Sequence, residues 1–378
     1  MRYNRFTLKI YRNDWGVHVS KQTKKKKSVG KIVGFSLIGV MILFILASMI
    51  LVKFIYDRQF PRYDRHDETV TAALRYKDMA DDYPRELVDF LSGDHRLQGY
   101  IYIQDDAPGL VVVAHGIGGG ADSYLSQIKY FLDQGWQVFA YDATGSFDSE
   151  GKSTKGFPQS LVDLDAALTY IASQPTLTDK PLLLFGHSWG GYAVASIPHY
   201  DYEIAGIASV SAVSKPIDMI IEQGERMMGP FIYTQYPFIW GYQRILFGAM
   251  ADYNAVDALN QSSVPALIVH GSEDEMFDYE GSALIARIDE ITNPFVESLP
   301  ITVSGQNGHN SLFRSSSANG YLEGLNDEYR ELYDNYDQEI PYEIKQDFYA
   351  KIDRILAQDI NLTLMNEIHR FYLDCLDR

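Results

Sequence analysis

The sequence predicts an α/β protein in which a doubly wound, mostly parallel sheet follows one N-terminal transmembrane helix. Short apolar runs alternate with longer stretches of helical periodicity over most of the chain, which is typical of such sheets. The runs at 110–114 and 182–185 are apolar without alternation, as expected of strands buried on both faces. An uncharged run at 32–52 predicts the membrane helix.

The charge of the chain is divided between a basic head and an acidic body. The 378 residues carry a net charge of −17, to which residues 1–56 contribute +10 and the remaining residues −27. An acidic body argues against nucleic acid as a partner, because phosphate binding needs a basic face. Cys375 is the one cysteine, so no intrachain disulfide can form. Nothing in the sequence predicts the oligomeric state.

The run at 32–52 is expected to act as a signal anchor. As a helix its 21 residues extend about 31 Å, close to the thickness of a hydrocarbon core. A buried core helix would normally carry a polar face, and this run is apolar all round. A cleavable signal peptide is the stronger alternative, with Ala47-Ser48 as a weak cleavage site, but its apolar region usually spans only about 7–15 residues.

The orientation of this helix follows from the positive charges. Ten of the eleven Lys and Arg residues within residues 1–56 precede the span. The positive-inside rule therefore places the N-terminus in the cytoplasm. We expect a single-pass protein of the cell membrane whose larger domain lies on the outer face.

The chain is expected to have five parts. They are a basic cytoplasmic segment (1–31), the transmembrane helix (32–52), a stalk (53–83), an α/β domain (84–311) with a cap insertion at about 214–263, and a helical extension (312–378). Strands are predicted at 97–103, 110–114, 137–141, 182–185, 204–210, 266–269 and 295–303. Helices are predicted at 123–134, 161–173 and 281–291, with a short helix in the stalk at 70–79.

Polar and glycine residues follow five of the predicted strands. Each of these stretches combines Gly with His, Ser or Asp, at residues 115–120, 142–146, 186–190, 270–274 and 305–309. Ligands of parallel sheets bind beyond the carboxyl ends of the strands. The five stretches therefore predict a functional site at one edge of the sheet.

Ser188 is the candidate nucleophile. It lies at the centre of Gly-His-Ser-Trp-Gly, a Gly-x-Ser-x-Gly pattern between an apolar strand and a helix start rich in small residues. This pattern forms a sharp turn that exposes the serine, with Gly186 and Gly190 leaving room for close backbone approach. A serine hydroxyl is a weak nucleophile and needs a neighbouring base.

His309 is the candidate base, because it is late in the chain and lies in a glycine-rich loop after the last strand. Asp274, after the strand at 266–269, is the candidate acid, giving the order Ser, Asp, His. Neighbouring carboxylates remain alternatives, namely Glu273, Glu275 and Asp278. Three further histidines at strand ends are interpreted as loop supports rather than metal ligands, since they lack ligand spacing: His115, His187 and His270.

Backbone N–H groups are the candidate oxyanion donors. Trp189 follows the nucleophile, and Ile117 lies in the loop after the strand at 110–114. The sequence His-Gly-Ile-Gly-Gly-Gly in that loop lacks the Lys-Ser/Thr of a phosphate-binding loop and the dinucleotide spacing. We therefore expect no cofactor and no metal.

The ordered stretches AHGIGGG, DATGSFDSEG, GHSWGG, HGSEDEMFD and GHNS resemble the α/β-hydrolase superfamily, and look closest to its monoacylglycerol-lipase-like and serine-aminopeptidase-like branch. The resemblance covers roughly residues 84–311. It implies Ser188, His309 and Asp274 as a triad with Ile117 and Trp189 in the oxyanion hole. Ala143-Thr144 and Gly119-Gly120 depart from the pattern, and the resemblance implies that both lie near the substrate.

The expected function is that of a membrane-anchored serine hydrolase. It would cleave esters or small amides through an acyl-enzyme, with a small or lipid-like acyl substrate. A serine aminopeptidase-like peptidase and a non-catalytic binding module of the same fold are the alternatives.

The cap and the C-terminal extension are expected to be helical. The cap is rich in aromatic residues and Met, which suits the wall of an apolar pocket. Apolar residues at helical spacing predict two helices after residue 343 that pack on the body, and Cys375 is expected to be buried on the second. The acidic, tyrosine-rich stretch at 326–343 is predicted to be either a mobile bridge or a contact surface.

Overall fold

The computed structural model describes residues 11–13, 16–18 and 29–378. It contains two compact units, Met1–Leu51 and Val52–Arg378. The first unit holds two short antiparallel strands, β1 (Tyr11–Asn13) and β2 (Gly16–His18), and most of helix α1 (Val29–Gln59). Most of the basic segment predicted at 1–31 lies outside the described residues.

Helix α1 contains the whole run predicted to cross a membrane. It is long and apolar enough for a single span, and most of its apolar side chains from residue 32 to residue 51 are exposed. Exposed apolar side chains on a long helix suit a lipid environment. A helix with this length and position is compatible with a single-pass anchor and with a signal sequence.

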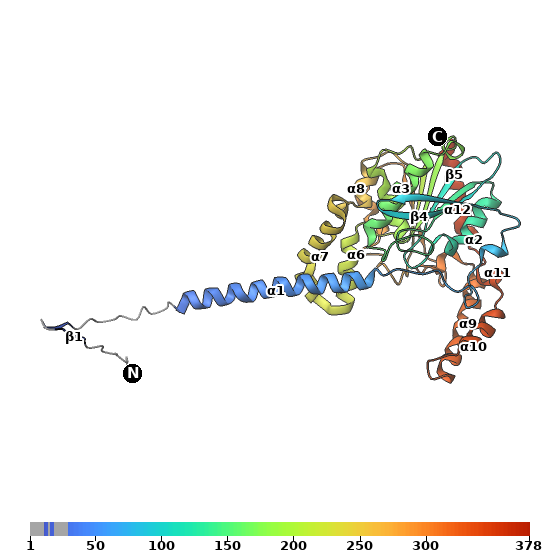
Figure 1. The fold of residues 1–378 in the computed structure, drawn as a ribbon. Helices are drawn as coiled ribbons and strands as arrows, with labels where there is room; N and C mark the ends of the chain where they lie inside the picture. The colour runs from blue at the N-terminus through green and yellow to red at the C-terminus, as the bar shows by residue number, and fades with distance from the viewer. Residues whose placement is uncertain (1–10, 14–15, 19–28) are drawn as a thin grey trace. The chain divides into compact units, whose positions relative to one another are not determined.

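The second unit is built on an eight-stranded sheet (Figure 1). Its strand order is β10-β9-β8-β7-β5-β6-β4-β3; strands β5 to β10 run parallel, and β3 and β4 are antiparallel. The strands are β3 (Glu86–Ser92), β4 (His95–Tyr102), β5 (Leu110–Ala114), β6 (Gln137–Tyr141), β7 (Leu182–His187), β8 (Gly206–Val210), β9 (Ala266–Gly271) and β10 (Val296–Ile301). The prediction of a mostly parallel sheet is confirmed.

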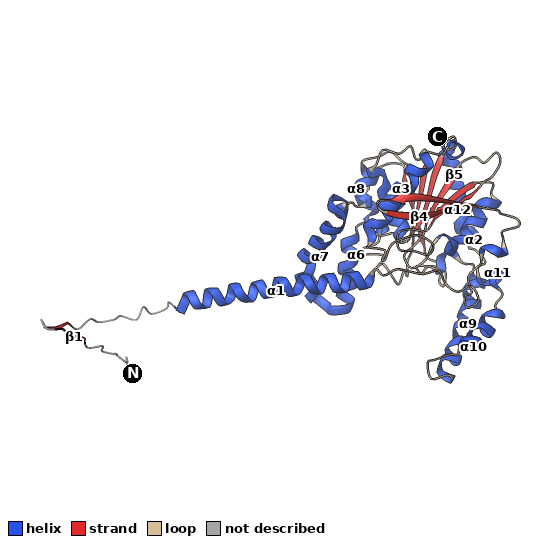
Figure 2. Cartoon of the chain, in the orientation of Figure 1, coloured by secondary structure: helices blue, strands red, loops and turns tan. Residues whose placement is uncertain are grey.

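Helices cover both faces of this sheet (Figure 2). One face packs against α3 (Phe157–Ala172), α5 (Trp189–Ser196) and α8 (Ala255–Asn260), and the other against α2 (Leu125–Asp133) and α12 (Leu362–Leu376). In β5 the side chains of Leu110 and Val112 enter the first core, while Val111 and Val113 enter the second. This alternation explains why the strand is apolar at every position.

Three local predictions differ from the structure. Strand β3 was not predicted, because its apolar residues do not alternate regularly with polar ones: Leu87 and Leu91 are exposed on this edge strand, whereas Ser92 is buried. The helix predicted at 281–291 is a 3-10 stretch, η6 (Leu284–Glu290), and the stalk helix predicted at 70–79 is reduced to the 3-10 turn η1 (Tyr76–Asp78). Short 3-10 segments carry no pattern that separates them from a helix.

The cap insertion is helical, as predicted. It contains α6 (Pro216–Met228), the 3-10 turn η4 (Gly229–Phe231), α7 (Ile232–Phe247) and the 3-10 turn η5 (Gly248–Asp252) before α8. The remaining short elements are η2 (Ala121–Tyr124), α4 (Pro175–Thr178), η3 (Ile197–His199) and η7 (Ser311–Phe313).

The C-terminal extension contains α9 (Ser316–Asn335), α10 (Tyr342–Ala350) and α11 (Arg354–Ala357) before α12. Much of the acidic, tyrosine-rich stretch is therefore helix, because α9 runs on to residue 335. The rings of Tyr329 in α9 and Phe348 in α10 pack at a centroid distance of 5.2 Å. Figure 1 shows this helix pair extending away from the sheet.

Segments on both sides of the predicted α/β domain contribute to its core. Tyr56 and Phe60, from the end of α1 and the residue after it, are buried in the first core, and Cys375 is buried in α12. The hydroxyl of Tyr372 in α12 donates a hydrogen bond of 2.8 Å to the carbonyl of Leu184 in β7. The stalk and the extension thus have contacts with the sheet or its covering helices.

Candidate active site

Ser188 lies on a sharp turn between β7 and α5. Its φ is 56°, a left-handed value that is uncommon for a residue with a side chain. A Cβ atom on Gly186 would lie 2.3 Å from the carbonyl oxygen of Gly190, and one on Gly190 would lie 2.1 Å from that of Ala114. Neither position accepts a side chain, so the two glycines allow the turn that presents Ser188.

The structure brings His309 and Asp274 together. Asp274 follows β9 and His309 follows β10, and the Nδ1 atom of His309 lies 2.7 Å from Oδ2 of Asp274. Both side chains are buried. The other oxygen of Asp274 accepts hydrogen bonds from the backbone N–H groups of Met276 and Phe277, which fix the carboxylate in orientation.

Asp274 is held in its charged form. Burial alone would raise the pKa of the Asp274 carboxyl, but the imidazoles of His270 and His309 beside it outweigh burial and hold the pKa well below its usual range. A carboxylate that stays ionised can orient an imidazole and stabilise its protonated form.

His309 lies beside His187, the residue that precedes the candidate nucleophile. The two imidazole rings lie 4.8 Å apart, and Nε2 of His187 lies 3.0 Å from the backbone oxygen of His309. Among the described residues, the hydroxyl of Ser188 has no hydrogen-bond partner. In many enzymes without substrate this bond is long, and it tightens only when substrate is bound.

The predicted oxyanion donors lie beside this turn. A Cβ atom on Gly116 would be 3.4 Å from Cβ of Ser188, so the loop after β5 runs against the nucleophile. Trp189 is the first residue of α5, where a helix leaves its N–H groups without an internal partner. The backbone N–H of Ile117 makes no hydrogen bond within the described part of the chain. Both groups are available to a ligand.

The loop after β5, residues 115–120, is held by Tyr124, which the sequence did not single out, and by Asp142, the first residue of the polar stretch at 142–146. The hydroxyl of Tyr124 accepts a hydrogen bond from the N–H of Gly116 and lies 2.6 Å from Nδ1 of His187. Asp142 accepts a hydrogen bond from the N–H of Ala121 at the end of the loop. No local pattern in the sequence marks Tyr124 for this role.

His115 and His187 support loops, as predicted. The Nε2 atom of His115 accepts the N–H of Ala143, and its Nδ1 lies 2.8 Å from the carbonyl of Gly116. Burial lowers the pKa of His115 to about 4 and holds the pKa of His187 well below its ordinary value. Both imidazoles are therefore neutral near pH 7.

His270 was interpreted as a loop support, but it contacts the candidate acid Asp274 directly. It is fully buried, and its Nε2 lies 3.1 Å from the same Asp274 oxygen that His309 approaches. A histidine four residues before the candidate acid is the sequence signal for this contact. The described residues contain no group of three or more His, Cys, Asp or Glu side chains arranged to hold a metal ion.

The unusual residues of the loops have structural explanations. Thr144 is fully buried, and its N–H and hydroxyl donate to the carboxylate of Asp163 at 2.7 and 2.8 Å. Its side chain thus faces the core rather than a substrate. A Cβ atom on Gly120 would lie 2.4 Å from an oxygen of Asp142, so this glycine permits a close contact between two loops.

The cap is tied to the loop that carries the acid. Glu222 in α6 accepts the N–H groups of Asp278 and Ser282, and Arg226 donates to the carbonyl of Glu275. Seven large apolar side chains of the cap are exposed: Met227, Phe231, Tyr233, Tyr236, Trp240, Ile245 and Leu246. The cap therefore presents an apolar surface and is positioned by the site's own loop.

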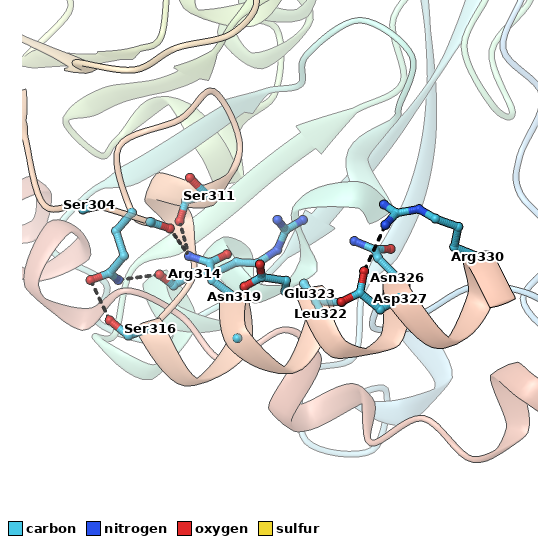
Figure 3. Close-up of a pocket in the computed structure, with 13 residues that line it drawn as sticks. Ser304, Ser311, Arg314, Ser316, Asn319, Leu322, Glu323, Asn326, Asp327 and Arg330 are labelled. Carbon is cyan, nitrogen blue, oxygen red and sulfur yellow. Dashed lines mark hydrogen bonds and ion pairs between the residues drawn. The ribbon is translucent and has the colours of Figure 1, made fainter.

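A polar cavity of about 660 Å³ lies between the His309 loop and α9 (Figure 3). Its lining includes Ser311, Arg314, Asn319, Glu323 and Arg330. Neither Ser188 nor Asp274 nor His309 lines this cavity. It is thus a different feature from the candidate active site.

Comparison with known proteins agrees with the fold. Residues 105–262 match the model of a family described as serine aminopeptidase, S33. The quorum-quenching protein AidA of Acinetobacter baumannii is 28% identical over 127 residues, which cover 32% of this chain and 42% of AidA. The uncharacterized protein YfhR of Escherichia coli O157:H7 is 26% identical over 212 residues, which cover 53% of this chain and 67% of YfhR.

An esterase of Pyrococcus furiosus has a similar solved structure, with a TM-score of 0.49 and 17% identity over 73% of this chain and 98% of the esterase. The chain spans less than half the length of AidA. The arrangement of strands and helices is that of an α/β-hydrolase fold, as the motifs predicted, and residues 105–262 are similar to the serine aminopeptidase family.

Exchange of the candidate acid tests the geometry of the site. Asp274→Asn should lower kcat about 10⁴-fold, because an amide cannot fix the imidazole in its productive form. Glu275→Gln is the matched control. Among the described residues, its carboxylate has one hydrogen bond, from the backbone N–H of His309, which an amide oxygen also accepts, so kcat should change little. Equal losses in the two variants would contradict the assignment of Asp274.

The buried histidines make the fold sensitive to acid. Because the folded-state pKa of His115 lies below its ordinary value of 6.5, the unfolded chain binds the proton first and stability falls as the pH drops from about 6.5 towards 4. Over this range His115 should account for a loss of roughly 3 kcal/mol.

Urea unfolding at a series of pH values measures this loss. His115→Gln, which keeps an acceptor for Ala143, should flatten the decline, whereas His66→Gln at an exposed position should leave it unchanged. The same decline in His115→Gln as in the wild type would show that another group is responsible.

Proposed function

We propose that this protein is a membrane-anchored serine hydrolase that cleaves esters or small amides through an acyl-enzyme. The observation that carries the proposal is the buried contact between His309 and Asp274 at the edge of the sheet where Ser188 occupies its strained turn. Acyl transfer needs a nucleophile, a base and an acid that orients the base. Here the three candidates come from three separate strand ends.

In the proposed reaction His309 takes the proton of Ser188 while the serine oxygen attacks the carbonyl carbon of the substrate. The backbone N–H groups of Ile117 and Trp189 stabilise the negative oxygen of the tetrahedral intermediate. His309 then gives its proton to the leaving alcohol or amine, and the acyl group remains on Ser188. Water, activated by His309 in the same way, releases the acid and restores the serine.

A serine aminopeptidase-like activity is the second candidate. It is favoured by the family match at residues 105–262. The apolar surface of the cap, with exposed Phe231 and Trp240, favours an apolar acyl group over a charged peptide terminus. We therefore rank the ester as the first substrate class to test.

A fluorophosphonate probe tests the nucleophile. The wild-type protein should be labelled and should hydrolyse p-nitrophenyl butyrate, while Ser188→Ala should lose both properties, because both need the hydroxyl of Ser188 as the nucleophile. Ser304→Ala, at an exposed serine beyond β10, is the matched control and should behave as the wild type.

The outcomes separate the candidate functions. Faster turnover of leucine p-nitroanilide than of the ester would assign the peptidase activity instead. Labelling that persists in Ser188→Ala would refute the nucleophile, and a folded wild type that is neither labelled nor active would indicate a binding module.

We propose that residues 32–52 anchor the protein with its hydrolase on the outer face. The support is the uncharged run within α1, which is longer than the apolar region of a signal peptide, and the basic residues that precede it.

Membrane fractions of a bacterial host expressing the full chain test the anchor. The protein should resist extraction with alkaline carbonate and keep its own N-terminus, and protease added to cells stripped of their wall should digest the hydrolase. Protection of the hydrolase would reverse the orientation, and a soluble product shortened near residue 48 would show a cleaved signal instead.

A further inference from the structure

Residues 60–66 form a strap across the loop that follows β6. The N–H of Tyr63 donates to the carbonyl of Gly145 at 2.9 Å, and the carbonyl of Tyr63 accepts the N–H of Phe147 at 2.8 Å. Arg62 donates to the carbonyls of Phe147, Ser149 and Gly151. This segment directly follows α1, so it connects the predicted anchor to the sheet edge of the candidate site.

Arg65 extends the strap to a second loop. Its guanidinium donates to Asp148 at 2.7 Å and to Asp122 at 2.5 Å. Asp122 is also bound by Arg85, and the side chains of Arg65 and Asp122 are 28% and 13% exposed. A partly buried network of this kind constrains its members more than an isolated surface ion pair does.

Asp122 lies next to the loop that carries the candidate oxyanion donor. It belongs to η2, the turn that continues the loop of residues 115–120 from which Ile117 would donate to the oxyanion. Tyr124, in the same turn, accepts the N–H of Gly116. The position of η2 therefore determines the shape of the loop on both sides of Ile117.

Tyr63 meets this loop directly. A Cβ atom on Gly118 would lie 3.7 Å from Cε1 of Tyr63, which is ordinary van der Waals contact. Gly118 follows Ile117 and has a φ of +87°, a conformation that glycine adopts without strain. The ring of Tyr63 thus packs on the residue next to the candidate oxyanion donor.

We infer that Arg65 and Tyr63 are positioning residues for the oxyanion loop, so that the segment leading out of the anchor helix holds the Ile117 N–H in place for catalysis. The inference rests on the proposed function. It follows from two independent contacts, the ion pairs of Arg65 with η2 and the packing of Tyr63 on Gly118. Displacement of a positioned group by about 1 Å can cost up to 10²-fold in rate.

Active-site titration of the full-length protein tests the role of Arg65. The fluorophosphonate gives the fraction of reactive Ser188, and p-nitrophenyl butyrate then gives kcat per labelled site. Arg65→Gln should lower kcat per site at least about 10-fold with little change in KM, because the lost interaction acts in the transition state. Arg65→Lys, which keeps the charge, should recover most of this loss.

Arg75→Gln is the matched control. Arg75 lies in the same N-terminal segment and pairs with Asp78, away from the oxyanion loop, so kcat per site should equal that of the wild type. A purely structural role of Arg65 would lower the labelled fraction and leave kcat per site unchanged, and this result would overturn the inference.

Tyr63→Leu is the second variant, and it leaves the ion pairs intact. It should also lower kcat per site, and an unchanged value in both Tyr63→Leu and Arg65→Gln would refute the role of the strap. A wild-type protein that is not labelled would refute the proposed function itself. Failure of the proposed function can therefore be distinguished from failure of the inference about the strap.

Discussion

The close approach of α5 to the ends of β5 and β7 is the constraint on which the site depends. Gly190 touches the backbone of Ala114, and Gly186 touches that of Gly190, so the helix starts against the strand ends with no space for a side chain. The chain can enter α5 from β7 only through the left-handed conformation of Ser188. This geometry directs the serine away from the sheet and brings the Trp189 N–H beside the loop after β5. Because β9 and β10 run parallel to β7, the loops that carry Asp274 and His309 reach the same edge.

The loops at this edge are held mainly by one another. Asp142, after β6, binds the loop after β5, and His115, in that loop, accepts the N–H of Ala143 after β6. Asp142 is fully buried, and burial raises the pKa of its carboxyl to about 6 in spite of the hydrogen bonds that it accepts. Polar groups buried without water must be paired, so a change in one loop is transmitted to its neighbours.

The parallel sheet and the candidate triad could be predicted from the sequence because their signals are local. Strands buried on both faces are apolar runs, and Ser188 and Asp274 each follow such a run, whereas His309 follows the half-buried edge strand β10 at the same sheet edge. Strand β3 escaped prediction because this exposed edge strand lacks a regular alternation of apolar and polar residues. The contacts of Arg65 and Tyr124 escaped it for another reason. Each depends on a partner brought close only by the fold, as Arg65 and Asp122 are, 57 residues apart in sequence.

The hydrogen bond from Tyr372 to the carbonyl of Leu184 links the last helix to the strand that leads to the nucleophile. Until α12 has been synthesised, one face of β5 and β7 lacks a cover that includes Ile368 and Tyr372. A ribosome makes the other parts of the hydrolase first, and an incomplete sheet exposes apolar surface that favours aggregation. The second core is therefore completed only after α12 has been synthesised. Chaperones would need to protect this chain until α12 has emerged.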